Sequence, residues 1–326
     1  MYLLNIEYFL AIAEVGNITR AAEKLYISQP ALSQYLKRLE ENLGSELFDR
    51  SKSPMPLTYA GQRYLRHILQ IQKMDREIRA ELRDIGDEIS GCLRLGIALW
   101  RGACLLPEIF PTFHKQYPRV SVELTEGASN VLERELLADR IDLAVMNLPQ
   151  GLNYPQLTSD IILEEPIFLA FPTHHPSAVR ILSQQKDIRG YPLAPVSLLE
   201  EIPLIYTCTG QNLTRQINHF LTRHNLMPEI LMQTRNLTTA INLVSRGIAC
   251  TLVPGEGVEV CTHPGRVTYF RLEDPELSWP LAFVYRKNNY MSRIAKSFIC
   301  STKEILGKRS FESRDADNIS CQPYAY

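Results

Sequence analysis

The sequence has few of the features that mark secreted, disulfide-bonded or membrane proteins. Its 326 residues include only seven cysteines, which are scattered and form no Cys-x-x-Cys pair. An odd, dispersed set argues against a disulfide scaffold or a zinc site and is typical of a reducing compartment. The N-terminal segment has no basic region ahead of its apolar residues, and no apolar run approaches the roughly eighteen residues of a membrane span. We therefore expect a cytoplasmic protein without a signal peptide.

Catalytic motifs are missing as well. The sequence contains no Gly-x-Ser-x-Gly nucleophile elbow, no phosphate-cradling glycine loop and no His-Glu-x-x-His zinc motif. His174 and His175 are adjacent, but no third ligand is spaced to complete a metal site, so a loop cap is the favoured interpretation. We expect no enzyme activity, no metal site and no cofactor.

A large excess of positive charge, the usual electrostatic mark of a nucleic-acid-binding protein, is also absent. The chain has 35 Lys and Arg against 36 Asp and Glu, a formal net charge of -1, and its first sixty residues are just as balanced. Any DNA binding must therefore depend on where individual charges lie and on the avidity of an oligomer.

What the sequence does contain is a pattern for two short helices joined by a tight turn, over residues 17–37. Asn17 and Ser28 are suited to cap the two helices, because their side-chain oxygens can accept a free backbone N–H. Pro30 falls in the first turn of the second helix, where a missing N–H costs least. Tyr26 and Ile27 make the turn between them.

On a helical wheel the second helix separates an apolar face from a polar face. The apolar face consists of Leu32, Tyr35, Leu36 and Leu39, and the polar face of Gln29, Pro30, Ser33, Gln34 and Lys37. Glutamine can pair bidentately with adenine, serine can bond a base or a phosphate, and lysine can neutralise a phosphate. The polar face therefore suits the DNA major groove, although the solvated face of an ordinary helix pair has a similar pattern.

A longer series of residues matches a known family. The series is Phe9, Thr19, Ala21, Ala22, Leu25, residues 28–33 (Ser-Gln-Pro-Ala-Leu-Ser), Leu39, Glu40, Leu43, Gly44, Leu47, Phe48, Arg50, Thr58 and Gly61. Together these residues resemble the N-terminal winged helix-turn-helix domain of the LysR-type transcriptional regulators. The departures are Asn17, Ile18 and Gln34, where Ser, Phe and Arg are common in the family.

The resemblance implies a set of DNA contacts. These residues are Thr19, Ser28, Gln29, Pro30, Ser33, Gln34, Lys37, Arg50 and Lys52. Arg50 and Lys52 belong to residues 47–57, a predicted short β-wing with a Ser-Pro-x-Pro turn. From the residues alone, contact with phosphate or the minor groove and simple solvation are equally good interpretations of these two charges.

Residues 58–88 have the pattern of one long amphipathic helix. Its apolar positions recur every three or four residues, at Tyr64, Leu65, Ile68, Ile71, Met74, Ile78, Leu82 and Ile85. Such a helix is too long and too charged to bury in a small domain, so we expect it to pair with a second copy rather than to act as a strut in a monomer. In the resembled family it is the dimerisation linker, which implies a homodimer, or a homotetramer through effector-domain contacts.

After Ser90 and Gly91, predicted strands and helices alternate, which indicates βαβ units and a parallel sheet. This part resembles the family's effector domain, whose two-subdomain architecture is like that of type 2 periplasmic binding proteins. The expected fold class is thus α/β with an N-terminal all-α winged helix-turn-helix and a long linker helix.

The resemblance also gives boundaries. The winged helix-turn-helix takes residues 1–60, the dimerisation linker helix 61–89, the effector-binding domain 90–306, and a polar tail, which we expect to be disordered, 307–326. Within the effector domain, subdomain I takes residues 91–163 and 267–306, and subdomain II takes residues 164–266.

Ligands of parallel α/β sheets bind beyond the carboxyl ends of strands, near helix N-termini. Four segments fit this description: residues 98–102, 127–130, 207–211 and 236–238. They supply the candidate effector-binding residues Leu99, Trp100, Arg101, Ser129, Thr207, Thr209, Asn236 and Thr238.

Two residues of the first segment have an alternative interpretation. Arg101 could fork onto a carboxylate or phosphate, and Trp100 could stack on an aromatic ligand. Alternatively, Trp100 packs between the subdomains and Arg101 pairs with a nearby acid. Cys208 lies within the segment 207–211, and because no resolving cysteine is apparent, an inert buried thiol is favoured over a redox sensor.

The expected function is that of a LysR-type regulator that binds an inverted-repeat operator and responds to a small molecule, an anion being one option, bound between two α/β subdomains. Its expected partners are double-stranded DNA, the effector and a second copy of itself, with RNA polymerase as a further candidate. The alternative is a cytoplasmic small-molecule-binding or enzymatic α/β domain whose helix-turn-helix serves only for interaction.

Overall fold

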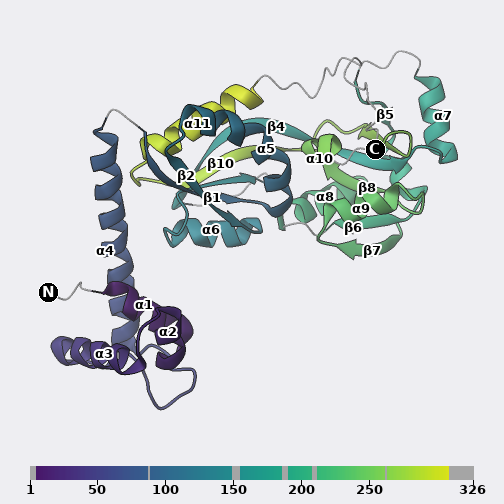
Figure 1. The fold of residues 1–326 in the computed structure, drawn as a ribbon. Coiled ribbons are helices and arrows are strands. Elements are labelled where there is room, and N and C mark those ends of the chain that lie inside the picture. Colours follow the sequence, from purple (N-terminus) through teal and green to yellow (C-terminus); the bar gives the residue numbers. More distant parts are fainter. Residues whose placement is uncertain are drawn as a thin grey trace, which may run out of the picture. The chain divides into compact units, whose positions relative to one another are not determined.

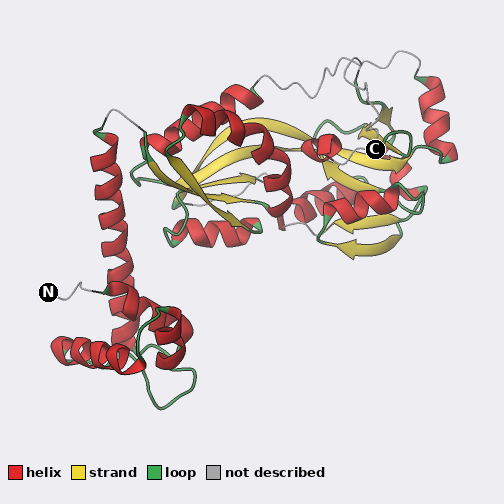
Figure 2. Cartoon of the chain, viewed as in Figure 1, coloured by secondary structure: helices red, strands yellow, loops and turns green. Residues whose placement is uncertain are grey.

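The computed structural model describes residues 5–86, 89–148, 155–185, 190–207, 211–260 and 263–307. The chain consists of two compact units, Met1–Leu82 and Arg83–Tyr326. Within the described residues, the named strands all belong to the second unit, and the first is built from helices and loops (Figure 2). The predicted disorder of the polar tail concerns residues that, apart from Gly307, lie outside the described range.

The first unit begins with α1 (Ile6–Val15), α2 (Ile18–Lys24) and α3 (Gln29–Leu43) (Figure 1). Both predicted caps are confirmed. The Asn17 side chain accepts a hydrogen bond from the N–H of Arg20 at 3.0 Å, and the Ser28 hydroxyl accepts one from the N–H of Ala31 at 3.4 Å. The apolar faces of the three helices meet in one core with the following loop, which includes Phe9, Ile12, Leu32, Leu36 and Phe48.

The wing that follows α3 is a minimal hairpin. Phe48 and Leu57 form a single antiparallel bridge. The hydroxyl of Thr58 then donates to the carbonyl of Glu46 at 2.7 Å and accepts from the N–H of Gly61 at 3.0 Å, which caps the next helix. A Cβ atom on Gly61 would lie 2.0 Å from the carbonyl oxygen of Leu47, so only glycine lets this helix pass so close to the wing.

That helix, α4, runs from Tyr59 to Asp84, four residues short of the predicted end. The residues near its predicted end, 87 and 88, lie outside the described range. Its apolar stripe is largely exposed: Met74, Ile78 and Leu82 are each more than half accessible. A stripe of this kind lacks the burial that usually stabilises an amphipathic helix within one chain.

The second unit is built on a mixed sheet with the strand order β2-β1-β3-β10-β4-β9-β5, and β8 also pairs with β4. The strands are β1 (Gly91–Ile97), β2 (Val120–Glu126), β3 (Leu143–Asn147), β4 (Leu157–Pro172), β5 (Leu193–Ala194), β8 (Thr251–Pro254), β9 (Val267–Leu272) and β10 (Ser278–Arg286). A second, parallel sheet is formed by β6 (Leu204–Thr207) and β7 (Ile230–Thr234). The predicted parallel pairing holds for β1 with β2 and β3, whereas β10 is antiparallel to both of its neighbours.

Helices cover both faces of these sheets (Figure 1). They are α5 (Leu99–Gln116), α6 (Ser129–Leu137), α7 (Pro176–Gln184), the 3₁₀ helix η1 (Val196–Glu200), α8 (Gln211–Arg223), α9 (Leu237–Val244), α10 (Gly255–Val260) and α11 (Arg293–Leu306). Near one end, α5 and α11 bury their apolar side chains in a common core on one face, while α6 packs in a separate cluster with β3 and the start of β4. The strands β5 and β7 and the helices α7 and α10 were not predicted.

The strand β4 divides the second unit into two subdomains. Its first half pairs with β10, and its second half, from Ile167 to Pro172, pairs with β8 and β9. The strand β9 therefore belongs to subdomain II, which corrects the predicted boundary at residue 267. The physical reason is that both faces of β9 are buried in subdomain II, Phe270 in one core and Tyr269 in another. The chain returns to subdomain I with β10.

Candidate DNA interface and effector site

The residues predicted to contact DNA share one property in the structure: none of them is buried. Ser33 is half-buried and the other eight are exposed, namely Thr19, Ser28, Gln29, Pro30, Gln34, Lys37, Arg50 and Lys52. On the opposite side of α3, Leu32, Leu36 and Leu39 are at most 5% accessible. The predicted separation of α3 into a core face and a polar face is thus confirmed, while the DNA contacts themselves stay predictions.

The first turn of α3 holds its polar side chains in a defined arrangement. The Nε2 of Gln29 donates a hydrogen bond to the Ser33 hydroxyl at 2.8 Å. An amide group carries two N–H donors and one oxygen acceptor, so Gln29 keeps one donor and its oxygen for an adenine edge. The internal bond thereby orients the amide without removing the pair of groups that base recognition needs.

Arg50 has a structural partner on the wing. Its guanidinium contacts the Glu40 carboxylate at 2.5 Å, and the other oxygen of Glu40 accepts the N–H of Leu47 at 2.7 Å. Because the Glu40 side chain is only 8% accessible, this ion pair ties the wing to α3. The Arg50 side chain is still 52% accessible, and its remaining N–H donors can reach a phosphate.

Lys52 is the freer of the two wing cations. Its Nζ lies 3.6 Å from the Asp49 carboxylate, and its side chain is 70% accessible. Hydrogen bonds from the Ser51 hydroxyl and N–H lower the pKa of Asp49, so this acid stays ionised beside the lysine. Such exposed pairs are weak and break readily when a phosphate approaches.

The effector segment at residues 98–102 forms the start of a helix. Trp100 and Arg101 lie in the first turn of α5, which begins at Leu99 directly after the extended Ala98. Ala98 has no side-chain cap. The sequence therefore contains no capping signal at this helix start. The two proline residues inside α5 make the helix still harder to recognise from the sequence.

Arg101 lies in a buried polar cluster, which we call the hinge cluster: Arg101 of α5, Asn147 of β3, Glu165 of β4 and Trp279 of β10. The Arg101 guanidinium donates to Asn147 at 2.5 Å and to Glu165 at 2.8 Å, and both charged side chains are fully inaccessible. The same carboxylate oxygen accepts the Asn147 amide at 3.0 Å and the Trp279 indole N–H at 2.9 Å.

The hinge cluster gives the Arg101 charge an anionic partner inside the protein, which is what a buried guanidinium requires. It also ties the start of α5 to both strands that run between the subdomains. Sequence reasoning missed Asn147, Glu165 and Trp279, because 46 or more residues separate each of them from Arg101 along the chain. Contact of Arg101 with an effector stays a prediction.

Trp100 packs from subdomain I onto subdomain II. It is half-buried against a cluster that includes Phe168, Leu237 and Val258. A Cβ atom on Gly257 would lie 3.4 Å from the indole ring, so α10 approaches the tryptophan closely. The Arg101 guanidinium carbon lies 5.3 Å from the centre of the same ring, a distance typical of a cation–π contact.

The remaining predicted effector residues lie at helix starts. Ser129 is buried in the first turn of α6. Asn236 is exposed and caps α9 by accepting the N–H of Thr239 at 3.2 Å, and Thr238 is exposed in the first turn of that helix. The side chains of Leu99 and Thr207, and the whole of Cys208 and Thr209, lie outside what the structure describes.

The structure supports the loop-cap interpretation of His175, whose Nδ1 accepts the N–H of Ser177 at 3.3 Å at the start of α7. Within the described residues, no group of three or more His, Cys, Asp and Glu side chains could hold a metal ion. Burial raises the pKa of Cys250 to about 12, so this thiol stays protonated at neutral pH. Among the helices of the described ranges, none is long and apolar enough to cross a membrane.

Comparison with protein families gives two matches that together span most of the chain. Residues 3–62 match the family described as "Bacterial regulatory helix-turn-helix protein, lysR family". Residues 86–306 match the family described as "LysR substrate binding domain".

Individual proteins agree with these families. The chain is 30% identical over 314 residues to YcgK, an uncharacterised helix-turn-helix transcriptional regulator of Bacillus subtilis (strain 168), a match that covers 94% of this chain and 95% of YcgK. It is also 30% identical over 300 residues to the transcriptional regulator AlsR of the same organism, covering 92% of this chain and 94% of AlsR.

Solved structures share the fold. Full-length CbnR in complex with its target DNA matches with a TM-score of 0.63 at 21% identity, covering 94% of this chain and 100% of that one. HinK from Pseudomonas aeruginosa matches with a TM-score of 0.57 at 24% identity, covering 94% of this chain and 98% of that one.

Proposed function

Because this chain belongs to the LysR family of bacterial helix-turn-helix transcriptional regulators, we propose that the polar face of α3 reads its operator and that a small molecule bound between the two subdomains controls the response. The protein is a DNA-binding regulator and not an enzyme, because the similar proteins are named as transcriptional regulators. The alternative of an enzymatic domain with an accessory helix-turn-helix is therefore dropped.

The observation that carries the DNA part is the ordered, exposed first turn of α3. Gln29 and Ser33 lie on its polar face and read base edges, with one donor and the oxygen of the Gln29 amide still available. Thr19, Lys37, Arg50 and Lys52 contact phosphates, which fix the position of the protein on the duplex. Ser28, Pro30 and Gln34 complete the surface beside them.

The exposed stripe on α4 supports a dimer. Met74, Ile78 and Leu82 recur every four residues and are accessible in the single chain, as expected of residues that a second copy covers. Two chains joined in this way present two α3 helices and therefore bind an inverted repeat. The dimers associate further into tetramers through the effector domains.

The effector site lies between the start of α5 in subdomain I and the start of α9 in subdomain II, where Asn236 and Thr238 are exposed. Helix starts supply backbone N–H donors, which favours an anionic effector. An effector that binds one arrangement of the subdomains more tightly shifts the population toward it. The regulator acts in the cytoplasm, where its DNA is, and RNA polymerase is the partner through which it changes transcription.

Selection of random duplex DNA by the full-length protein at a fixed salt concentration tests the DNA part. We expect an AT-rich inverted repeat, and we expect Gln29→Ala to lose preference at the adenine that Gln29 reads, by about 1–3 kcal/mol per site. Gln184→Ala, which removes an exposed helical glutamine of α7, is the matched control and should select the same repeat. Recovery of the same repeat by Gln29→Ala would remove this residue from the interface.

A further inference from the structure

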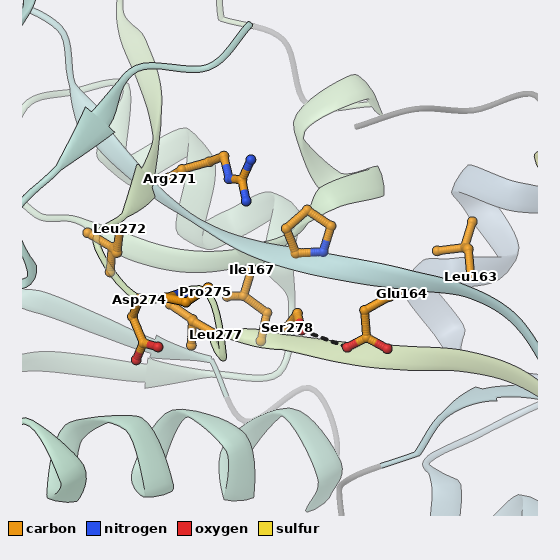
Figure 3. Close-up of a pocket in the computed structure, with 10 residues that line it drawn as sticks. Leu163, Glu164, Ile167, Arg271, Leu272, Asp274, Pro275, Leu277 and Ser278 are labelled. Atoms are coloured by element: carbon orange, nitrogen blue, oxygen red, sulfur yellow. Dashed lines mark hydrogen bonds between the residues drawn. The ribbon is translucent and has the colours of Figure 1, made fainter. Parts of the chain in front are cut away.

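A cavity lies at the hinge between the subdomains, and none of the predicted effector segments lines it. Its volume is about 380 Å³, and its wall includes Glu164 and Pro166 of β4, Arg271 and Leu272 of β9, and Leu277 and Ser278 where β10 begins (Figure 3). We call it the hinge pocket. Pockets for small ligands span about 300–1,000 Å³, so the hinge pocket suits a small molecule.

The hinge pocket contains one available cation. Within the described residues, the guanidinium of Arg271 has no ion-pair or hydrogen-bond partner, and the side chain is half-buried. Its five N–H donors can form two parallel bonds to a carboxylate. A half-buried guanidinium without a protein partner is more strongly attracted to an anion than one in open water.

The pocket also contains an available anion. The carboxylate of Glu164 accepts one hydrogen bond from the Ser278 hydroxyl, at 2.6 Å (Figure 3), and the residue is exposed and lines the pocket. Asp274 also lines the pocket, but its carboxylate is held by Arg223 and by the His224 Nε2 at 2.7 Å. Glu164 is therefore the acid that a ligand meets.

The rest of the wall includes apolar residues, among them Pro166, Leu272 and Leu277. We infer that the hinge pocket binds an α-amino acid with an apolar side chain: Arg271 takes its carboxylate, Glu164 takes its ammonium group, and the apolar wall takes its side chain. A simple carboxylic acid would pair with Arg271 but place a second anion near Glu164. A simple amine would pair with Glu164 but place a second cation near Arg271.

The pocket lies next to the hinge cluster along both strands. Glu164 precedes Glu165, and Ser278 precedes Trp279, and neighbouring residues of a strand point to opposite faces. A ligand that binds the Glu164 side chain therefore acts on the peptide unit next to Glu165, which is the ion-pair partner of Arg101. Through them the amino acid biases the arrangement of the subdomains, a consequence that rests on the proposed function, whereas its binding does not.

The test is a thermal-shift screen of the full-length protein without DNA, with each proteinogenic L-amino acid alone, followed by calorimetric titration of those that raise Tm. We expect at least one apolar amino acid to bind with one site per chain. Arg271→Met and Glu164→Gln should each weaken it by about tenfold or more, since each removes a charge-assisted hydrogen bond.

Two control variants make the outcome decisive. Arg266→Met removes an exposed arginine just before β9 and outside the pocket, and should bind as the wild type does. Asn236→Ala alters the proposed effector site and should also retain binding. The inference is overturned if no amino acid binds the wild type, if Arg271→Met and Glu164→Gln bind normally, or if Asn236→Ala alone abolishes binding. Because DNA is absent, none of these results depends on whether α3 reads the operator.

Discussion

Lys37 and Gln29 share the polar face of α3, but they act on different parts of the DNA. Lys37 lies about two turns further along the helix and is 73% accessible, with only a loose pair to Glu41 at 3.8 Å. An exposed pair of this kind contributes little to folding. The ammonium group is therefore available to neutralise a phosphate, whatever the base sequence beside it.

We expect Lys37→Ala to weaken binding to all sequences alike and to reduce the slope of log K against log salt by about 0.9, the value for one phosphate contact. Binding measured by fluorescence anisotropy over a salt series checks this. Lys296→Ala, at an exposed site on α11 in the other unit, should leave the slope unchanged. An unaltered slope in Lys37→Ala would mean that α3 is oriented differently on the duplex.

At this scale, the sequence could predict what depends on a residue and its near neighbours. Asn17 and Ser28 cap their helices as expected, because a cap acts over three residues. The sequence could not predict the partner of Arg50 or of Arg101, because tertiary packing brings Glu40 and Glu165 to them. It also gave no sign that the turn residue Tyr26 adopts a left-handed conformation, with φ of 55° and 97% accessibility.

At the scale of elements, the hinge cluster joins one helix to three strands. Arg101→Met would leave the Glu165 carboxylate buried without its cation, which typically costs about 3–5 kcal/mol of folding free energy. We expect the double change Arg101→Met and Glu165→Gln to recover part of that loss, because it removes the second charge as well. Denaturant unfolding of the full-length chain measures both.

The matched control for this prediction is Arg140→Met. Arg140 also pairs with a glutamate, Glu135, but its side chain is 62% accessible. Its loss should therefore cost no more than about 1 kcal/mol. If Arg101→Met proved as mild as Arg140→Met, the hinge cluster would not be the constraint on α5 that its geometry indicates.

The exposed stripe of α4 leads to a prediction about assembly. Ile78 lies at the middle of the stripe and is 53% accessible in the single chain. Ile78→Glu would bring a charge into the interface of the proposed dimer and should lower the mass measured by sedimentation equilibrium. Glu81→Gln, an exposed change on the same helix, should keep the wild-type mass. An unchanged mass for Ile78→Glu would place the dimer contact elsewhere.

How well each element could be predicted follows from how local its signal is. The helix α11 is evident from the sequence, since its apolar positions have a clear helical period. The strand β7 was missed because four of its five residues are exposed, so no alternation of apolar and polar residues marks it. The first half of β4 was missed because it includes Asp160, Glu164 and Glu165, whose places are set by pairing with β10.

At the scale of the whole molecule, the two compact units have separate cores. The core that contains Leu36 includes residues of the first unit alone, and Leu36 is fully buried. Leu36→Ala should therefore destabilise the DNA-binding unit by about 2–5 kcal/mol and leave the effector unit unaffected. Calorimetry should show one unfolding transition shifted and the other unchanged.

The matched control is Ala295→Gly in α11, a buried position in the core of the effector unit. This change should lower the free energy of unfolding of the effector unit by about 1 kcal/mol, and so shift the other transition to a lower temperature. A common shift of both transitions in either variant would show that the units unfold together.

The path of the chain through the hinge has a consequence for engineering and for evolution. The chain leaves subdomain I along β4 and returns along β10, and Pro166 and Ser278 are direct partners in this antiparallel pair. Everything between them is thus an insertion whose two ends already lie side by side. Joining neighbouring ends costs little loop entropy. Subdomain II can therefore be exchanged between relatives as one continuous segment. Such an exchange would make the same DNA-binding unit respond to a different effector without altering the DNA site that it recognises.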